Sequence, residues 1–172
     1  MIAIRAEVEA DHERVLEIQA AAFGRQNEAD LVEALRRSAH PMLSLVAEEG
    51  GGISGHVFFS PVGLDPPATA PPLGGLAPVA VEPERQGQGI GSALIRAGLE
   101  RCPALGWQAV FLVGNPAYYA RFGFELAAPT GLRYGDPRFD PVLQVLEFQP
   151  GALAACSGRL CFHPAFAETG CG

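Results

Sequence analysis

The chain has 172 residues, of which 48% are apolar, and a formal net charge of −7. This length and composition predict one compact α/β domain over residues 1–172 with a full hydrophobic core, and no stretch reaches the roughly 18 apolar residues of a membrane span. The acidic balance argues against nucleic acid, which binds basic patches, and mildly favours a cationic partner.

Neither targeting nor redox signals are prominent in the sequence. The N-terminus lacks the basic flank and long apolar region of a signal peptide, so we expect a cytoplasmic protein without a membrane partner. The four cysteines show neither close pairing nor metal-ligand spacing. We therefore expect reduced thiols, no disulfide and no metal.

In chain order, the first half combines short strands with amphipathic helices. The predicted elements are strands at 2–8, 43–47 and 53–61, helices at 10–23 and 27–37, and a proline-rich loop at 65–72. Asp11 and Asn27 are the expected N-caps, and Glu28 lies in a first helical turn, where the helix dipole favours an acid. The glycines at 50–52 supply the tight hairpin between the second and third strands.

The second half begins with an apolar strand that leads into a glycine-dense turn. The predicted elements are strands at 76–81, 108–113, 124–127, 142–148 and 159–162, helices at 90–102 and 116–122, and an irregular segment at 128–141. Pro78 cannot donate a ladder hydrogen bond, so we expect a bulge or a local break in the first of these strands.

The turn itself has the composition of an anion cradle. Gly87, Gly89 and Gly91 alternate just before a helix, so backbone N–H groups stay uncovered by side chains where the helix exposes unpaired amides and its positive dipole end. A diphosphate is the expected guest.

Two common phosphate-binding designs fail at this turn. The P-loop requires a lysine, but all 12 basic residues are arginine. A dinucleotide fingerprint would place a third glycine at Ser92 and an acid at the end of the next strand, which here ends in Val113-Gly114-Asn115. The remaining pattern is Gln/Arg-x-x-Gly-x-Gly/Ala, filled by Gln86, Gly89 and Gly91, with Arg85 adjacent to add charge.

Residues 73–91 resemble the coenzyme A signature of the GNAT superfamily of N-acetyltransferases. A second block, residues 115–124, resembles the later motif of that superfamily, in which a tyrosine lies four residues before a Gly-Phe pair. The segments at 23–25 and 161–166 further resemble the YhbS-like branch. The resemblance implies a mixed central sheet of about six to seven strands with a splayed central pair, flanked by about four helices.

It also implies acetyl-CoA as co-substrate, held at the splayed strands and the glycine turn. If Pro78 separates the strands at 76–81 and 108–113, the amides of Val79 and Val81 are released to bind the pantetheine arm and the thioester oxygen. Asn115 caps the following short helix and, in the family, also touches the cofactor arm. The expected cofactor-binding residues are Val79, Ala80, Val81, Arg85, Gln86, Gly87, Gln88, Gly89, Ile90, Gly91, Ser92 and Asn115.

In the superfamily an amine attacks the thioester directly, without an acyl-enzyme. The resemblance selects Tyr119 rather than Tyr118 as the general acid that protonates the departing thiolate. No motif identifies the general base: Glu28 lies in the region that forms the acceptor pocket in similar proteins, and His56 shares a strand face with Ser60. A satisfied structural histidine, a solvated helical acid and a water relay are the competing interpretations.

The sequence therefore predicts an acetyl-CoA-dependent N-acetyltransferase whose acceptor is a small amine or an exposed amino group of a protein or peptide. Two alternatives stay open. One is a non-catalytic acyl-CoA sensor, because the base is not evident, and the other is a transferase of a longer acyl group. The strand at 158–162 and its tail are candidates for pairing with a second copy in a homodimer.

Overall fold

The computed structural model describes residues 1–67 and 70–172. The expected loop at 65–72 includes residues 68 and 69, which lie outside the described part. The helices are α1 (His12–Phe23), α2 (Asn27–Ser38), α3 (Ile90–Arg101), α4 (Pro116–Tyr119) and α5 (Ala165–Glu168). The strands are β1 (Ala3–Ala6), β2 (Leu43–Glu49), β3 (Gly52–Asp65), β4 (Leu73–Val81), β5 (Ala109–Val113), β6 (Glu125–Leu126), β7 (Leu132–Arg133), β8 (Leu143–Glu147) and β9 (Gly158–Cys161).

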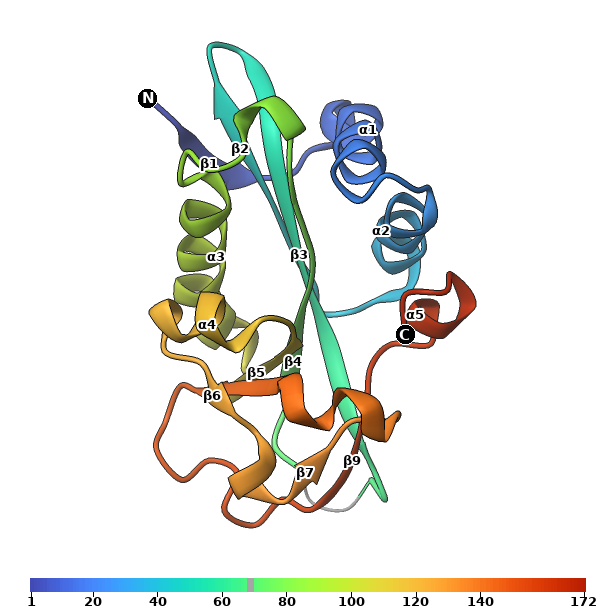
Figure 1. Ribbon diagram of the computed structural model, residues 1–172, viewed down its shortest axis with the longest axis vertical. Helices are drawn as coiled ribbons and strands as arrows, with labels where there is room; N and C mark the ends of the chain where they lie inside the picture. Colours follow the sequence, from blue (N-terminus) through green and yellow to red (C-terminus); the bar gives the residue numbers. More distant parts are fainter. Residues whose placement is uncertain (68–69) are drawn as a thin grey trace.

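A single mixed sheet forms the middle layer of the molecule. Its main path runs β1-β2-β3-β4-β5-β8-β6, and β9 joins the far end of β3 to β7. The only parallel pair on that path among the described strands is β4 with β5. Helices α1, α2 and α5 lie on one side of the long β3 strand, and α3 and α4 lie on the other (Figure 1). The predicted mixed sheet with helices on both faces is confirmed.

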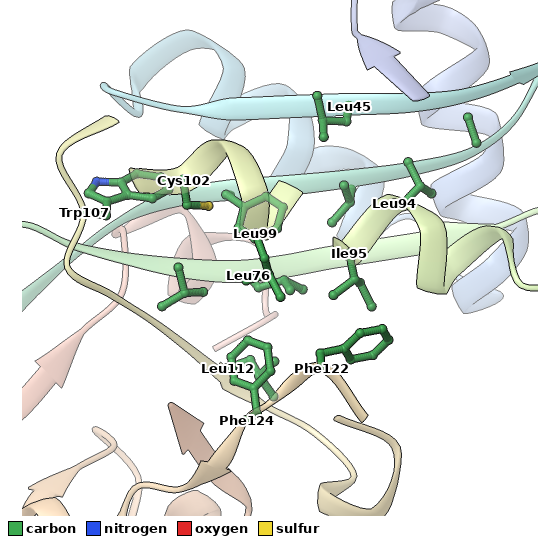
Figure 2. Packing of buried hydrophobic residues seen from close by; sticks show 14 of the residues in the cluster. Leu45, Leu76, Leu94, Ile95, Leu99, Cys102, Trp107, Leu112, Phe122 and Phe124 are labelled. Atoms are coloured by element: carbon green, nitrogen blue, oxygen red, sulfur yellow. The ribbon is translucent and has the colours of Figure 1, made fainter. Parts of the chain in front are cut away.

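Helix α3 packs closely on the sheet because its inner face combines branched apolar residues with a glycine. Leu94 and Ile95 are fully buried and face strand residues such as Leu45 and Leu112 (Figure 2). At Gly98 an added Cβ would lie 2.2 Å from the Phe59 ring. The helix and sheet approach so closely that a larger residue at this position would push them apart.

The central strands separate where the sequence suggested. β4 pairs with β5 only from Leu73 to Gly75, whereas β5 continues along β8 as far as Val113. The register between β3 and β4 also shifts, so that Ala77 and Pro78 together lie opposite Phe58. The predicted bulge and splay are both confirmed, although the splay opens at Leu76, before the proline is reached.

The strand at 158–162 pairs within the chain and one predicted helix cap is wrong, whereas the homodimer stays a prediction. The strand at 158–162 is not an unpaired edge, because β9 pairs with β3 on one side and with β7 on the other. Its tail forms α5, which packs against α2. Asp11 does not cap α1; its carboxylate accepts from Arg5 and from the Val8 amide.

Across the described residues, no helix is both long and apolar enough to span a bilayer.

Candidate active site

The glycine turn borders a cavity of about 610 Å³ at the end of β4. Its lining combines the end of β4, the turn and the start of α3 with residues of α1 and α4: Ala22, Phe23, Val79, Ala80, Val81, Arg85, Gln86, Gly87, Gly89, Ile90, Gly91, Ser92, Tyr118 and Arg121. Most of the expected cofactor-binding residues thus surround one hollow. Gln88 and Asn115 are exceptions, since neither contributes to this lining.

The turn leaves its backbone amides open to this cavity. Gly87 and Gly89 have φ values of +75° and +84°, and a Cβ added at either position would meet no described atom within 4 Å. The first helical hydrogen bond of α3 runs from the Ala93 amide to the Gly89 carbonyl, at 3.0 Å. The amides between Gly89 and Ala93 therefore precede the first hydrogen bond of the helix. They lie at its positive dipole end, where an anion is stabilised.

Polar side chains fix the turn and add positive charge. The side-chain amide of Gln86 donates to the Val81 carbonyl at 3.1 Å and so holds the turn against the end of β4. Arg85 donates to Gln88 and forms an ion pair with Glu49, whose pKa it lowers. Arg121, which the sequence reasoning did not select, lines the cavity with its guanidinium 4.5 Å from the centre of the Tyr118 ring. Its position next to the tyrosine motif was the available signal, but an exposed arginine there is common.

The open edge of β4 continues from this cavity along the splay. The Glu82 amide donates to the Ser54 carbonyl of β3. In an antiparallel pair the direction of the amides alternates, so the Val79 and Val81 amides point away from β3, toward the gap left by β5. This is the orientation expected for donors to a ligand lying between the two strands.

The two neighbouring tyrosines of α4 pack edge to face with ring centroids 4.9 Å apart, but they have different further contacts. The Tyr118 hydroxyl oxygen is 3.6 Å from the position of a Cβ on Gly91, at the cavity. The Tyr119 ring packs against Gly114, just after β5, and against Phe124 at a centroid distance of 6.0 Å. Burial raises the pKa of Tyr119 to about 12, which keeps the phenol protonated at neutral pH but weakens it as an acid.

His56 lies inside a buried network. Its side chain is fully buried; the Gln19 amide donates to Nδ1 at 2.8 Å, and Nε2 lies 2.8 Å from the Ser44 hydroxyl, which in turn donates to Glu7. Burial lowers the pKa of His56 to about 4. With both ring nitrogens occupied and no exposed surface, this histidine fits the structural interpretation, and its selection as a catalytic base does not agree with the geometry.

Glu28 lies beside a second, smaller cavity, called the aromatic cavity below. The cavity measures about 280 Å³ and is lined by Arg25, Leu76, Ala77, Val113, Tyr134, Phe139, Phe162, Phe166, Gly170, Cys171 and Gly172. Glu28 is 5% exposed and accepts two hydrogen bonds from Arg25 Nε, at 3.0 and 3.1 Å. Its carboxylate is thus held behind an arginine that faces the cavity.

Asn27 does not cap α2, because its side chain donates to the Thr169 carbonyl. Asn115 caps α4 as expected.

Comparison with known proteins agrees with this arrangement. The family model of the acetyltransferase (GNAT) domain matches residues 3–127. The chain is 42% identical over 121 residues to the uncharacterized N-acetyltransferase YjhQ of Escherichia coli K12, covering 69% of this chain and 67% of that protein. It is 36% identical over 164 residues to the uncharacterized N-acetyltransferase YhbS of the same organism, covering 95% and 97%.

Two solved structures show the same fold over nearly the whole chain. The crystal structure of E. coli YhbS in complex with CoA superposes with a TM-score of 0.88, at 34% identity over 96% of this chain and 92% of that one. A GNAT family acetyltransferase from Brucella melitensis in complex with acetyl-CoA gives a TM-score of 0.79, at 36% identity over 96% and 98%. The chain belongs to the GNAT family of acetyltransferases.

Proposed function

We propose that this protein transfers an acetyl group from acetyl-CoA to a primary amine by direct attack. The observation that carries the proposal is the splay of β4 from β5, with the glycine-turn cavity at one end and the aromatic cavity at the other. The diphosphate would bind the amides from Gly87 to Ser92, and the pantetheine arm would lie along the Val79 and Val81 amides. The acceptor would enter from the aromatic cavity. The diphosphate fits because the two positive-φ glycines leave space that side chains would fill.

In the proposed reaction the amine lone pair attacks the thioester carbonyl carbon. The new C–N bond forms as the C–S bond breaks, and the sulfur keeps the electron pair of that bond. The amine loses one proton and the thiolate gains one, giving an amide and coenzyme A. Preorganised β4 amides would stabilise the charge that develops on the carbonyl oxygen.

For the two proton transfers we propose Tyr119 as acid and Glu28 as base. Tyr119 is supported by the packing of its ring on Gly114, just after β5, and by the family motif; its raised pKa must be offset by a close approach to the thiolate. Glu28 is supported by its contact with Arg25, which lines the aromatic cavity. A water molecule between the Glu28 carboxylate and the acceptor amine would relay the proton.

The test is release of coenzyme A from acetyl-CoA with the purified full chain and a panel of primary amines, with the acetylated product identified by mass spectrometry. We expect amine-dependent release. Binding of acetyl-CoA without release by any amine would instead favour the non-catalytic sensor. Faster release from propionyl- or succinyl-CoA would assign the protein to longer acyl groups.

A further inference from the structure

The aromatic cavity reaches the point where the acyl group would end. Leu76 and Ala77 of β4 and Val113 of β5 line it, and these residues lie one or two positions beyond the last parallel pair, Gly75 with Phe111. The next residues along β4 line the glycine-turn cavity instead. A ligand in the aromatic cavity therefore contacts the splay from the side opposite the diphosphate cradle.

Four aromatic side chains form a continuous wall of this cavity. The ring centroids of Phe139 and Tyr134 lie 5.5 Å apart, those of Tyr134 and Phe162 also 5.5 Å, and those of Phe162 and Phe166 5.4 Å. These are tilted and edge-to-face contacts, which hold the rings in place and leave ring surface for a guest. A cavity of about 280 Å³ lies at the small end of the range for ligand sites. The wall thus favours a small, apolar or aromatic guest.

The charge of the cavity is the opposite of what the net charge of the chain suggested. Among the described lining residues, Arg25 is the only one with a charged side chain, and no lining side chain is acidic; the one anionic group is the main-chain carboxylate of Gly172. Two of the five guanidinium N–H groups donate to Glu28, and no other described acceptor contacts this arginine, whose side chain is 50% exposed. The remaining N–H groups form an edge that suits a carboxylate.

We infer that the acceptor is an α-amino acid with an aromatic or large apolar side chain. Its carboxylate binds the open edge of Arg25, its side chain packs on the wall of Tyr134, Phe139, Phe162 and Phe166, and its amine points to the splay. A polyamine fits poorly, because no lining side chain is acidic and the aromatic wall offers no carboxylate along its length to a second ammonium. This inference rests on the proposed function and names the substrate class for the same reaction.

The test compares kcat/KM for four amines with acetyl-CoA and the full chain: L-phenylalanine, 2-phenylethylamine, L-alanine and spermidine. We expect L-phenylalanine to be the best of the four, by roughly tenfold or more over phenylethylamine, which lacks the carboxylate. L-alanine should be poor because it lacks the apolar body. Equal or better rates with phenylethylamine, L-alanine or spermidine would overturn the inference.

Two variants localise the effect within the cavity. Arg25→Lys keeps the charge beside Glu28 but loses the planar fork, so KM for L-phenylalanine should rise several-fold more than KM for phenylethylamine. Arg37→Lys, on the exposed end of α2, is the matched control and should change neither. Phe139→Leu should shift the preference from L-phenylalanine toward L-leucine. Unchanged constants in both Arg25→Lys and Phe139→Leu would place the acceptor elsewhere.

Calorimetry with acetyl-CoA separates the two levels of failure. If acetyl-CoA binds and other amines are acetylated faster than L-phenylalanine, the acceptor class is wrong and the proposed function stands. If acetyl-CoA does not bind, the proposed function fails and the acceptor class fails with it.

Discussion

The anion cradle can be isolated by one pair of glycine substitutions. Gly89 immediately precedes α3, and Gly106 follows the short 3₁₀ helix at Cys102–Leu105 that comes after α3. Their backbones are nearly identical: φ is 84° at both, and ψ is 2° and 1°. A Cβ added at either would meet no described atom within 4 Å. Gly89 borders the glycine-turn cavity, whereas Gly106 does not. The two positions therefore share the conformational cost of a substitution and differ in their access to the ligand.

We expect Gly89→Ala and Gly106→Ala to lose similar stability, about 1–2 kcal/mol each, because alanine disfavours the left-handed conformation. For a chain of this size that corresponds to a decrease in Tm of about 2–8 °C. Only the methyl group at residue 89 would cover amides that bind the diphosphate. Loss of one charge-assisted hydrogen bond, about 1.5–3 kcal/mol, raises Kd for acetyl-CoA roughly 10- to 150-fold.

The assay is isothermal titration calorimetry of acetyl-CoA with both variants, below the melting transition of each. Weak binding by Gly89→Ala with wild-type affinity in Gly106→Ala supports the cradle. Equal affinities in the two variants would refute the reasoning, because the shared strain would then be the only effect of either substitution.

Three further predictions concern single side chains. Tyr119→Phe should lower kcat about 10- to 100-fold with little change in acetyl-CoA affinity, because it removes a proton donor and keeps the ring. Tyr118→Phe should act mainly on affinity. Steady-state kinetics check both variants, and a normal kcat in Tyr119→Phe would show that Tyr119 is not the acid. Glu28→Gln should lower kcat by about 10²-fold and shift the pH–rate profile, and an unaltered profile would leave water as the base. Because the folded-state pKa of His56, about 4, lies below the unfolded value of 6.5, its neutral form should stabilise the fold above pH 6.5, and about 3 kcal/mol should be lost as pH falls from 6.5 to 4. Urea unfolding between pH 7 and 4.8 should show about 2 kcal/mol of this loss, which His56→Gln should lack. The same slope in that variant would assign the effect to other groups.

The parts of the fold that the sequence predicted are those with strong local patterns. The apolar spacing of α3 and the glycines of the turn fixed that helix and its N-terminus to within a residue. Pro78 predicted a bulge because a missing N–H is a property of one residue. Most residues of the anion cradle could be predicted for the same reason, because its backbone donors are contiguous in the chain.

Long-range pairings could not be predicted in this way. Nothing near β9 indicates that β3 extends far enough to pair with it, so the sequence left the strand at 158–162 as a candidate for pairing with a second copy. The burial of His56 depends on Gln19 and Ser44, which come from a helix and a strand elsewhere in the chain. The aromatic wall likewise combines a loop, the residue after β9 and α5. The β9 pairing, the burial of His56 and the aromatic wall all depend on contacts between distant segments, so no single segment of the sequence predicts them.

The central claim is that the amides between Gly87 and Ser92 bind the diphosphate while the acyl arm lies between β4 and β5. A crystal structure of this chain with acetyl-CoA tests it most directly. We expect the diphosphate oxygens within hydrogen-bonding distance of those amides and the thioester beside the Val79 and Val81 amides, facing the aromatic cavity. A diphosphate bound away from the turn, or an acyl group that does not enter the splay, would contradict the account.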